Sequence, residues 1–479
     1  MSSDERFVKC VKRELRRAFL GRSTAALGGM ALSTLAGDPR ASGGSAGGVP
    51  RAKRVISLFM HGGPSQLELF DYKPGLRSLH GSELPESMRA TQRLTGMTSG
   101  QSAFPIAAPF SRFRQCGSNG AWVSEYLPRT AGVVDRLAIV RSLFTEAINH
   151  DPAVTLMQTG HQQPGRPSFG AWASYGLGSE SANLPAFVVM ISRGSAARPA
   201  DPLYARLWGA GFLPSNHQGT LLRAGVDPVL YLSNPAGLSR QVRRGQLDLT
   251  RELNEQQMER DGDVETAARL EQFELAFRMQ SAVPELADLG GETAETLSLY
   301  GAESERPGSF ARNCVLARRM VERGVRFVQL YHRGWDQHYN LPSDLRLQCR
   351  DVDQASAALV LDLERRGLLE DTVVVWCGEF GRTVYSQGVL EASNYGRDHH
   401  GGCFSGWLAG GGVRGGQVWG ETDDFSVGVV RDGVHVHDLN ATLLHLLGVD
   451  HTRLTWRFQG RDYRLTDVYG RVIDGLVRG

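Results

Sequence analysis

Six short apolar runs separated by amphipathic segments constrain the fold of this chain more than any other feature. Each run is almost continuous in Val, Ile, Leu and Phe, which is typical of strands buried on both faces of a parallel sheet. The runs occupy residues 54–60, 136–143, 185–192, 325–331, 372–377 and 404–410. Because segments with helical periodicity lie between them, the pattern predicts an α/β fold with a doubly wound, mostly parallel sheet and a long insertion.

The clearest helical segment covers residues 351–367. It places Val352, Ala355 and Leu359 on one apolar stripe, and Gly367 is a helix-stop residue. This stripe predicts a helix that packs on one face of the sheet.

The predicted domain organisation is simple. Residues 1–50 are expected to be an export signal and linker, and residues 51–479 a single domain. Within that domain, residues 193–250 are rich in Pro, Gly and Asn and predict an irregular insertion, and residues 250–300 predict a helical excursion.

Composition excludes several classes of protein. With 479 residues and 41% hydrophobic content, the chain can bury a large core. The net charge of +2 hides a basic N-terminus, because residues 1–22 hold seven Lys/Arg against three Asp/Glu, which leaves the remainder slightly acidic. The charge pattern therefore gives no indication of a nucleic-acid partner. The six cysteines form no CxxC pair, so zinc-knuckle and redox motifs are absent from the sequence.

The N-terminus resembles a twin-arginine export signal. Arg16 and Arg17 are followed by Phe19 and Leu20 and then by a mildly apolar stretch rich in Gly and Ala. That stretch is too short and too weakly apolar to form a stable membrane span. We therefore expect a periplasmic or extracellular protein that meets the twin-arginine translocase during export, while a cytosolic amphipathic helix is the alternative.

Charged and imidazole side chains gather just after the predicted strands. In parallel sheets, ligands bind beyond the carboxyl ends of the strands, so these residues are the candidate functional groups. They are His61, Ser65, Glu68, Asp71, His150, Asp151, His332, Asp336, His338, Glu379, Arg382, Asp398, His399 and His400. Mixed imidazole and carboxylate ligands suit zinc, and carboxylate-rich shells suit manganese, magnesium or calcium, so the sequence predicts one or two divalent cations of unresolved identity.

Five motifs in order, "HGGPSQLELFDYKP", "GWDQH", "GEFGRT", "GRDHH" and "VHDLNATLLHLLGVD", carry a resemblance. Together they resemble the bacterial domain-of-unknown-function 1501 family, which groups twin-arginine-exported relatives of sulfatases within the alkaline-phosphatase-like superfamily. The resemblance covers residues 50–479. It implies a doubly wound core whose strand ends hold a metal-dependent hydrolase site.

The resemblance also implies roles for particular residues. Asp336 and His338 stand where the superfamily binds its first metal, and His399, or in its place His400, completes that shell. Glu379 and His61 stand where the superfamily places ligands of a second metal.

The nucleophile expected from the resemblance is missing. The superfamily places a Ser, Thr or modified Cys at the head of a helix that leads to a "TG" turn, and the matching position here is Pro152. Ser65 is the candidate nucleophile from another strand end, Thr155 is a poorer substitute, and direct attack by a metal-activated hydroxide is a third route. Arg382 is expected to neutralise an ester oxygen, unless it forms a salt bridge. Asp398 is expected to act in catalysis or to orient His399.

Two functions follow from this pattern. The first is an exported metal-dependent hydrolase of sulfate or phosphate esters, whose anionic substrate could be a sulfated glycan. The alternative is a non-catalytic protein that keeps the fold and binds a metal or an anion. The missing nucleophile favours the alternative, whereas the many charged residues at the strand ends favour the hydrolase, because buried charges without a ligand are costly.

Overall fold

The computed structural model of the protein describes residues 50–196, 202–225, 228–230, 232–261, 264–391 and 394–478. The predicted twin-arginine signal lies outside these residues.

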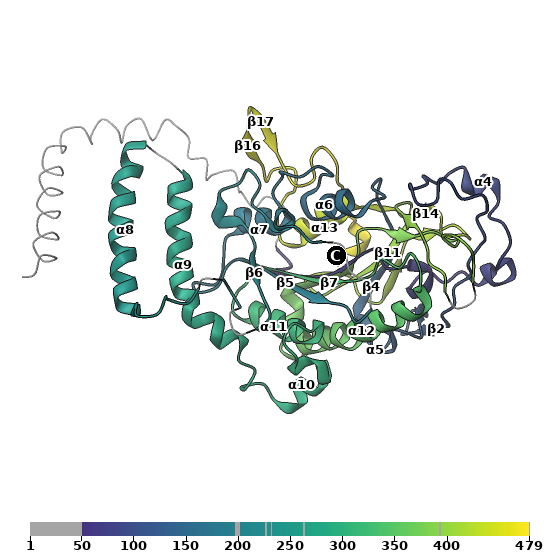
Figure 1. Cartoon of the computed structure of the whole chain (residues 1–479), viewed down its shortest axis with the longest axis horizontal. Coiled ribbons are helices and arrows are strands. Elements are labelled where there is room, and N and C mark those ends of the chain that lie inside the picture. The colour runs from purple at the N-terminus through teal and green to yellow at the C-terminus, as the bar shows by residue number, and fades with distance from the viewer. Residues whose placement is uncertain are drawn as a thin grey trace, which may run out of the picture. The chain divides into compact units, whose positions relative to one another are not determined.

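Within the described residues, nine strands form a central sheet in the order β12-β4-β11-β8-β1-β7-β5-β6, with β15 also paired to β4 (Figure 1). Every pairing is parallel except those of β11, which runs antiparallel to both β4 and β8. The strands are β1 (Arg54–His61), β4 (Leu137–Phe144), β5 (Phe187–Arg193), β6 (Thr220–Leu222), β7 (Phe327–Arg333), β8 (Thr372–Cys377), β11 (Phe404–Ala409), β12 (Gln417–Trp419) and β15 (Val434–His435). The predicted fold class, a doubly wound and mostly parallel α/β sheet, is confirmed.

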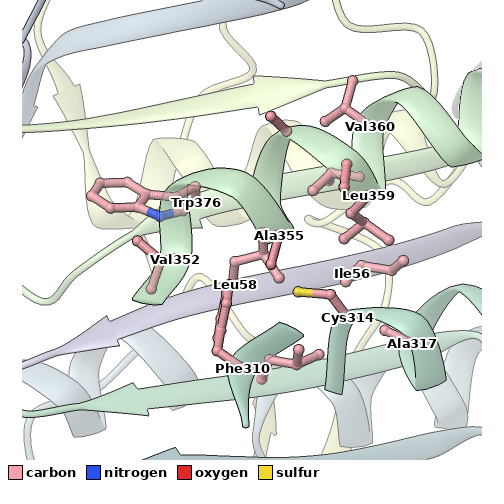
Figure 2. Packing of buried hydrophobic residues seen from close by; sticks show 14 of the residues in the cluster. Ile56, Leu58, Phe310, Cys314, Ala317, Val352, Ala355, Leu359, Val360 and Trp376 are labelled. Carbon is pink, nitrogen blue, oxygen red and sulfur yellow. The ribbon is translucent and has the colours of Figure 1, made fainter. Parts of the chain in front are cut away.

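Helices cover both faces of this sheet, and alternate strand residues contact the two layers. Ile56 and Leu58 of β1 pack against α11 (Phe310–Glu322) and α12 (Leu341–Arg365) (Figure 2). Val55 and Phe59, on the other side of the same strand, belong to the core that includes α6 (His150–Thr159), α7 (Phe169–Leu177) and α13 (Val436–Leu446). A central strand buried on both sides in this way must be apolar along its whole length.

The helix predicted at 351–367 is the carboxyl half of α12. Val352, Ala355 and Leu359 are buried on the sheet as the stripe predicts, and Gly367 lies just beyond the helix with a φ of +69°. The helix begins ten residues earlier than predicted, at Leu341, because Pro342 is compatible with a first helical turn.

The insertion is more regular than predicted. It contains the edge strand β6, and α8 (Arg240–Asp261) begins ten residues before the predicted irregular segment ends. The helical excursion includes most of α8 and a second long helix, α9 (Val264–Ala287). α9 packs antiparallel to α8 through contacts such as that of Arg244 with Glu274 (Figure 1). The short helix α10 (Ala294–Tyr300) follows.

Smaller elements complete the described part of the chain. They are α3 (Gln66–Leu69), α4 (Glu86–Arg89), α5 (Pro128–Ala131), β2 (Phe113–Cys116), β3 (Ala121–Ser124), β9 (Gly381–Arg382), β10 (His399–His400), β13 (Glu421–Thr422), β14 (Val429–Arg431), β16 (Trp456–Phe458) and β17 (Arg461–Tyr463). Among the described helices, none combines the length and the apolar character that crossing a bilayer requires. The five cysteines that the structure describes are all free thiols.

The sheet topology brings separate motifs to one edge. The carboxyl ends of the parallel strands β1, β4, β7 and β8 lie at the same edge of the sheet. Since β11 runs in the opposite direction, the residues that precede it, including β10, reach that edge too. The short pairing of β10 with β9 fixes His399 opposite Arg382 there.

Candidate metal centre

Six imidazole or carboxylate side chains meet where these strands end. They are His61 at the end of β1, His150 at the start of α6, Asp336 and His338 after β7, Glu379 after β8, and His399 in β10. Donor atoms of His150, Asp336, His338 and His399 all lie within 4.8 Å of one another. The structure therefore brings together all of the sequence-predicted ligands except His400, and it adds His150.

Two glycines allow the strand-end loops to approach each other this closely. Gly62 has a φ of +123°, and a Cβ there would lie 2.5 Å from the backbone nitrogen of Asp336. A Cβ at Gly396 would lie 1.9 Å from the carbonyl carbon of His338. Only glycine fits at either position, because heavy atoms that are not bonded to each other do not come this close.

One carboxylate oxygen is the centre of the cluster. Oδ1 of Asp336 lies 2.8 Å from Nε2 of His338, 3.2 Å from Nε2 of His150 and 3.3 Å from Nε2 of His399. The Nε2 atoms of His338 and His399 are 3.0 Å apart. Asp336, His338 and His399 thus place three donor atoms in a triangle with sides of 2.8 to 3.3 Å.

The hydrogen bonds behind two of the rings fix their tautomers. Nδ1 of His399 donates to the carbonyl oxygen of Ile148 at 2.8 Å, and Nδ1 of His338 donates to Oε1 of Gln387 at 2.5 Å. Each ring that donates from Nδ1 presents a lone pair at Nε2 when it is neutral. Two lone pairs and a carboxylate oxygen then face one another, an arrangement that a metal cation or a proton between them relieves. Separations of about 3 Å are also what donor atoms show when they share an ion with bonds of about 2.0–2.1 Å, so the residues fit a divalent metal.

His150 joins this triangle to Glu379. Its Nδ1 donates to Oε1 of Glu379 at 2.6 Å, while its Nε2 faces Asp336. Glu379 is fully buried and also accepts the backbone N–H of Gly62. A carboxylate behind an imidazole orients the ring and raises its basicity, as it does at many metal sites.

His61 lies on the other side of Glu379. Its Nδ1 is 3.5 Å from Oε1 of Glu379, and neither ring nitrogen has a hydrogen-bond partner among the described residues, although the side chain is 3% exposed. A buried imidazole without a hydrogen-bond partner is costly, so a second cation beside His61 and Glu379 would fit the donors present.

The pKa values of the cluster follow from burial and from these contacts. Burial opposes the charge on His150, but its bonds to Asp336 and Glu379 outweigh that effect and raise its pKa to about 9. Burial also opposes the charge on Glu379, yet the neighbouring His150 and His61 hold its pKa well below the usual range. For His399, burial is the largest effect and lowers the pKa to about 4, which keeps the ring neutral as a metal ligand must be.

Arg382 is not positioned to bind a substrate oxygen as predicted. Its guanidinium is 1% exposed and donates to the backbone carbonyls of Gly62, Gly63, Trp335 and Arg397. Among the described residues, its charged partner is Oδ1 of Asp336, at 2.6 Å. Of the two alternatives that the sequence left open for Arg382, the structure shows the salt bridge.

Ser65 lies outside the cluster. Its hydroxyl donates to Glu68, and Glu68 forms a fully buried ion pair with Arg397 at 2.6 Å. Arg397 also donates to the carbonyls of Ala107, Thr383 and Val384, so this group holds loops together behind the site.

Asp398 and His400 also lie outside the cluster, next to His399 in the sequence. The Asp398 carboxylate accepts the hydroxyls of Thr95 and Thr98 and the backbone N–H of His399, so it does not orient the His399 ring as expected. Nε2 of His400 donates to the carbonyl of Val427 at 2.6 Å, and His400 is not among the residues of the cluster. Because successive residues of a strand point to opposite faces, only one of the two histidines can reach the cluster.

Three residues of the site carried no assigned role in the sequence. His150 was recognised only as a residue beyond a predicted strand, and its position at the start of α6 was the available signal. Gln387 and the carbonyl of Ile148 had no signal, because their roles depend on which loops meet in space.

Comparisons with known proteins show what this chain is similar to. The PsFucS1 sulfatase from Pseudoalteromonas sp. shares 14% identity and a TM-score of 0.34, with 83% of this chain and 68% of that chain covered. A mutant of TAB5 alkaline phosphatase with Mg bound shares 12% identity and a TM-score of 0.31, with 79% and 96% covered. The phosphonate monoester hydrolase SpPMH from Silicibacter pomeroyi shares 11% identity and a TM-score of 0.27, with 67% and 68% covered. All three scores are low, so these similarities assign no activity to the chain.

The comparison with curated proteins gives no match. The sequence model of one family, described as "Protein of unknown function (DUF1501)", matches residues 52–477. That match spans the whole sheet, both helical layers and every residue of the cluster. The chain belongs to the DUF1501 family.

Proposed function

We propose that this protein is an exported metal-dependent hydrolase of sulfate or phosphate esters. One divalent cation is held by Asp336, His338 and His399, and a second ion beside His61 and Glu379 is part of the same proposal. The single observation that carries it is the triangle of donor atoms 2.8 to 3.3 Å apart, with two imidazole lone pairs facing a carboxylate oxygen.

The chain itself supplies the groups that such a reaction needs. A bound divalent ion would act as a Lewis acid on an ester oxygen and would activate water. His150 is held by Glu379 at Nδ1 and faces the triangle with Nε2, so Nε2 is the atom placed to move a proton between the attacking water and the leaving oxygen. Asp336, His338 and His399 would supply three protein ligands, the number that is typical of catalytic zinc sites.

Charge balance favours an anionic substrate. Asp336, Glu379 and Arg382 together carry a net charge of −1, and His150, whose pKa is raised to about 9, adds a positive charge near neutral pH. One divalent cation therefore makes this site net positive. A positive site with few water contacts attracts an anion strongly, because charges interact more strongly away from bulk water. A sulfated glycan or another sulfate or phosphate ester meets this requirement.

A non-catalytic protein that binds a metal or an anion is the second candidate. The observation that favours it is the position of Ser65, whose hydroxyl is engaged by Glu68 rather than directed at the cluster. Direct attack by activated water needs no protein nucleophile, and the hydrolase is therefore the first choice.

The test is elemental analysis of the purified protein by mass spectrometry, with Asp336→Asn beside the wild type. We expect about one equivalent or more of a divalent metal in the wild type and loss of that metal in the variant. Asp398→Asn is the control, because Asp398 also lies near the strand ends, but its carboxylate accepts hydrogen bonds from two hydroxyls and a backbone N–H rather than facing the imidazoles.

Turnover is then measured with aryl sulfate and aryl phosphate esters. Metal-dependent hydrolysis of either ester supports the hydrolase. Metal binding without hydrolysis of any ester supports the second candidate, and equal metal content in the wild type and Asp336→Asn would overturn the ligand assignment.

A further inference from the structure

Arg382 is buried beside the site and donates hydrogen bonds to several backbone carbonyls as well as to a carboxylate. Its Nε donates to Gly63 O at 2.9 Å, and one terminal nitrogen donates to Arg397 O at 3.0 Å. The other terminal nitrogen contacts Gly62 O, Trp335 O and the Asp336 carboxylate. The guanidinium thus joins the loops after β1 and β7 to the segment before β10. Asp336 and His338 lie in the second of these loops, and His61 and His399 lie in the strands β1 and β10 that adjoin the other two segments.

The partner of Arg382 is the same oxygen on which the histidines converge. Oδ1 of Asp336 lies 2.6 Å from the guanidinium and 2.8 to 3.3 Å from the three imidazoles. The Asp336 carboxylate lies on a short loop after a strand and could rotate there. The hydrogen bond from Arg382 to Oδ1 prevents this rotation. The planar fork of arginine can do so while also binding carbonyls, whereas the ammonium of lysine has neither the shape nor enough donors.

We infer that Arg382 is a positioning residue that fixes Asp336 and thereby sets the affinity and geometry of the metal site. This inference rests on the proposed metal centre and assigns Arg382 no contact with substrate. This role depends on the shape of the guanidinium and not on its charge alone. Lysine at position 382 would keep the charge but could not take over the role.

Arg397 provides a matched control. It is as buried as Arg382, pairs with a carboxylate at the same distance of 2.6 Å, and donates to backbone carbonyls in the same way. Its carboxylate partner is Glu68, which lies outside the metal cluster. A lysine at either position should therefore cost similar stability, but only the one at 382 should alter the metal site.

The experiment compares the wild type, Arg382→Lys and Arg397→Lys as full chains. The thermal midpoint of the metal-free proteins measures stability, competition with a chelator measures Zn²⁺ affinity, and the absorption spectrum of the Co²⁺-loaded proteins reports ligand geometry. We expect both variants to lose thermal stability. Arg382→Lys alone should bind Zn²⁺ about 10–100-fold more weakly and show an altered Co²⁺ spectrum.

Each other result has a definite meaning. Unchanged Zn²⁺ affinity in Arg382→Lys, or an equal loss in Arg397→Lys, would overturn the positioning role. If Arg382→Lys and Arg382→Gln both fail to fold while Arg397→Lys folds, the guanidinium serves the fold rather than the metal, which also overturns the inference. Failure of the wild type to bind Zn²⁺ or Co²⁺ would instead contradict the proposed function itself.

Discussion

The buried polar residues at these strand ends are of two kinds. The first kind directs donor atoms at Asp336 Oδ1, as His338 and His399 do. The second kind holds loops in place, as Arg397 does through Glu68 and three backbone carbonyls. A buried ion pair of the second kind adds little net stability but is costly to break, because the remaining charge stays buried without a partner.

Replacing Ser65 by alanine should affect stability and leave the metal site intact. The substitution removes a hydroxyl that donates to the buried carboxylate of Glu68, so we expect a loss of about 1–3 kcal/mol in the free energy of unfolding. Denaturant unfolding and elemental analysis measure the two quantities. Ser111→Ala is the control, because Ser111 donates to the backbone carbonyl of the same Glu68. Loss of ester hydrolysis in Ser65→Ala, with metal and stability retained, would instead make Ser65 catalytic.

Replacing Gly396 by alanine should damage the metal site through the backbone. The new Cβ would lie 1.9 Å from the carbonyl carbon of His338, so the two loops must separate. We expect a cost of about 3 kcal/mol or more in unfolding free energy and reduced metal content, measured by thermal unfolding and elemental analysis. Gly100→Ala, where nothing lies within 4 Å of the added carbon, should change neither quantity. Normal metal content in Gly396→Ala would show that the close approach is not required.

For the individual site residues, the sequence predicts the strand end at which each lies but not the contacts that it makes there. Asp336, His338, His399, Glu379 and His61 were found because polar residues beyond buried strands are informative in parallel sheets. The engagement of Arg382 by carbonyls was not predictable, since carbonyls carry no sequence signal. The choice of His399 over His400 needed the direction of β10, which the sequence left open.

Among the secondary structure elements, the strongly apolar strands were the most predictable. The six predicted strands agree with β1, β4, β5, β7, β8 and β11 to within two residues at each end. The antiparallel direction of β11 was not predicted, because a strand buried on both faces reads the same in either direction. Yet this direction is what delivers His399 to the site. The short strands β6, β12 and β15 are too brief for any periodic pattern.

The pairing of helices α8 and α9 should weaken in acid. Glu274 of α9 contacts Arg244 and Arg251 of α8, and the bond from Arg244 is the main cause that lowers the Glu274 pKa to about 2 from 4.5. Because the folded-state pKa is the lower one, the stabilisation is fully present above pH 4.5 and is lost as the pH falls towards 2. Hydrogen exchange of α8 and α9, corrected for the intrinsic effect of pH, should show faster opening across that interval. The Glu274→Gln variant should show a smaller pH dependence, and an equal dependence in both proteins would exclude Glu274 as the cause.

The candidate metal centre lies mostly buried within the described part of the molecule. His338 and His399 are 7% and 5% exposed, and their loops are fixed by Gly396 and by Arg382. The site is assembled from segments more than three hundred residues apart, such as His61 and Glu379. The cluster can therefore form only when the sheet is complete, so the metal binding that we propose would require a folded chain.

We propose export by the twin-arginine route from the N-terminal motif. That route carries proteins that are already folded, so it would suit a site that forms only in the folded chain. The prediction rests on Arg16 and Arg17. It is tested by measuring how the full chain is distributed between cytoplasmic and periplasmic fractions. Substituting both residues by lysine should retain the protein in the cytoplasm, folded and with its metal. Lysine at Arg13 and Arg22 makes the same number of conservative changes in the same segment and should leave export unaffected. Export that continues when the arginine pair is changed would contradict the predicted route, and metal-free protein in the cytoplasm of that variant would show that the ion is acquired after export.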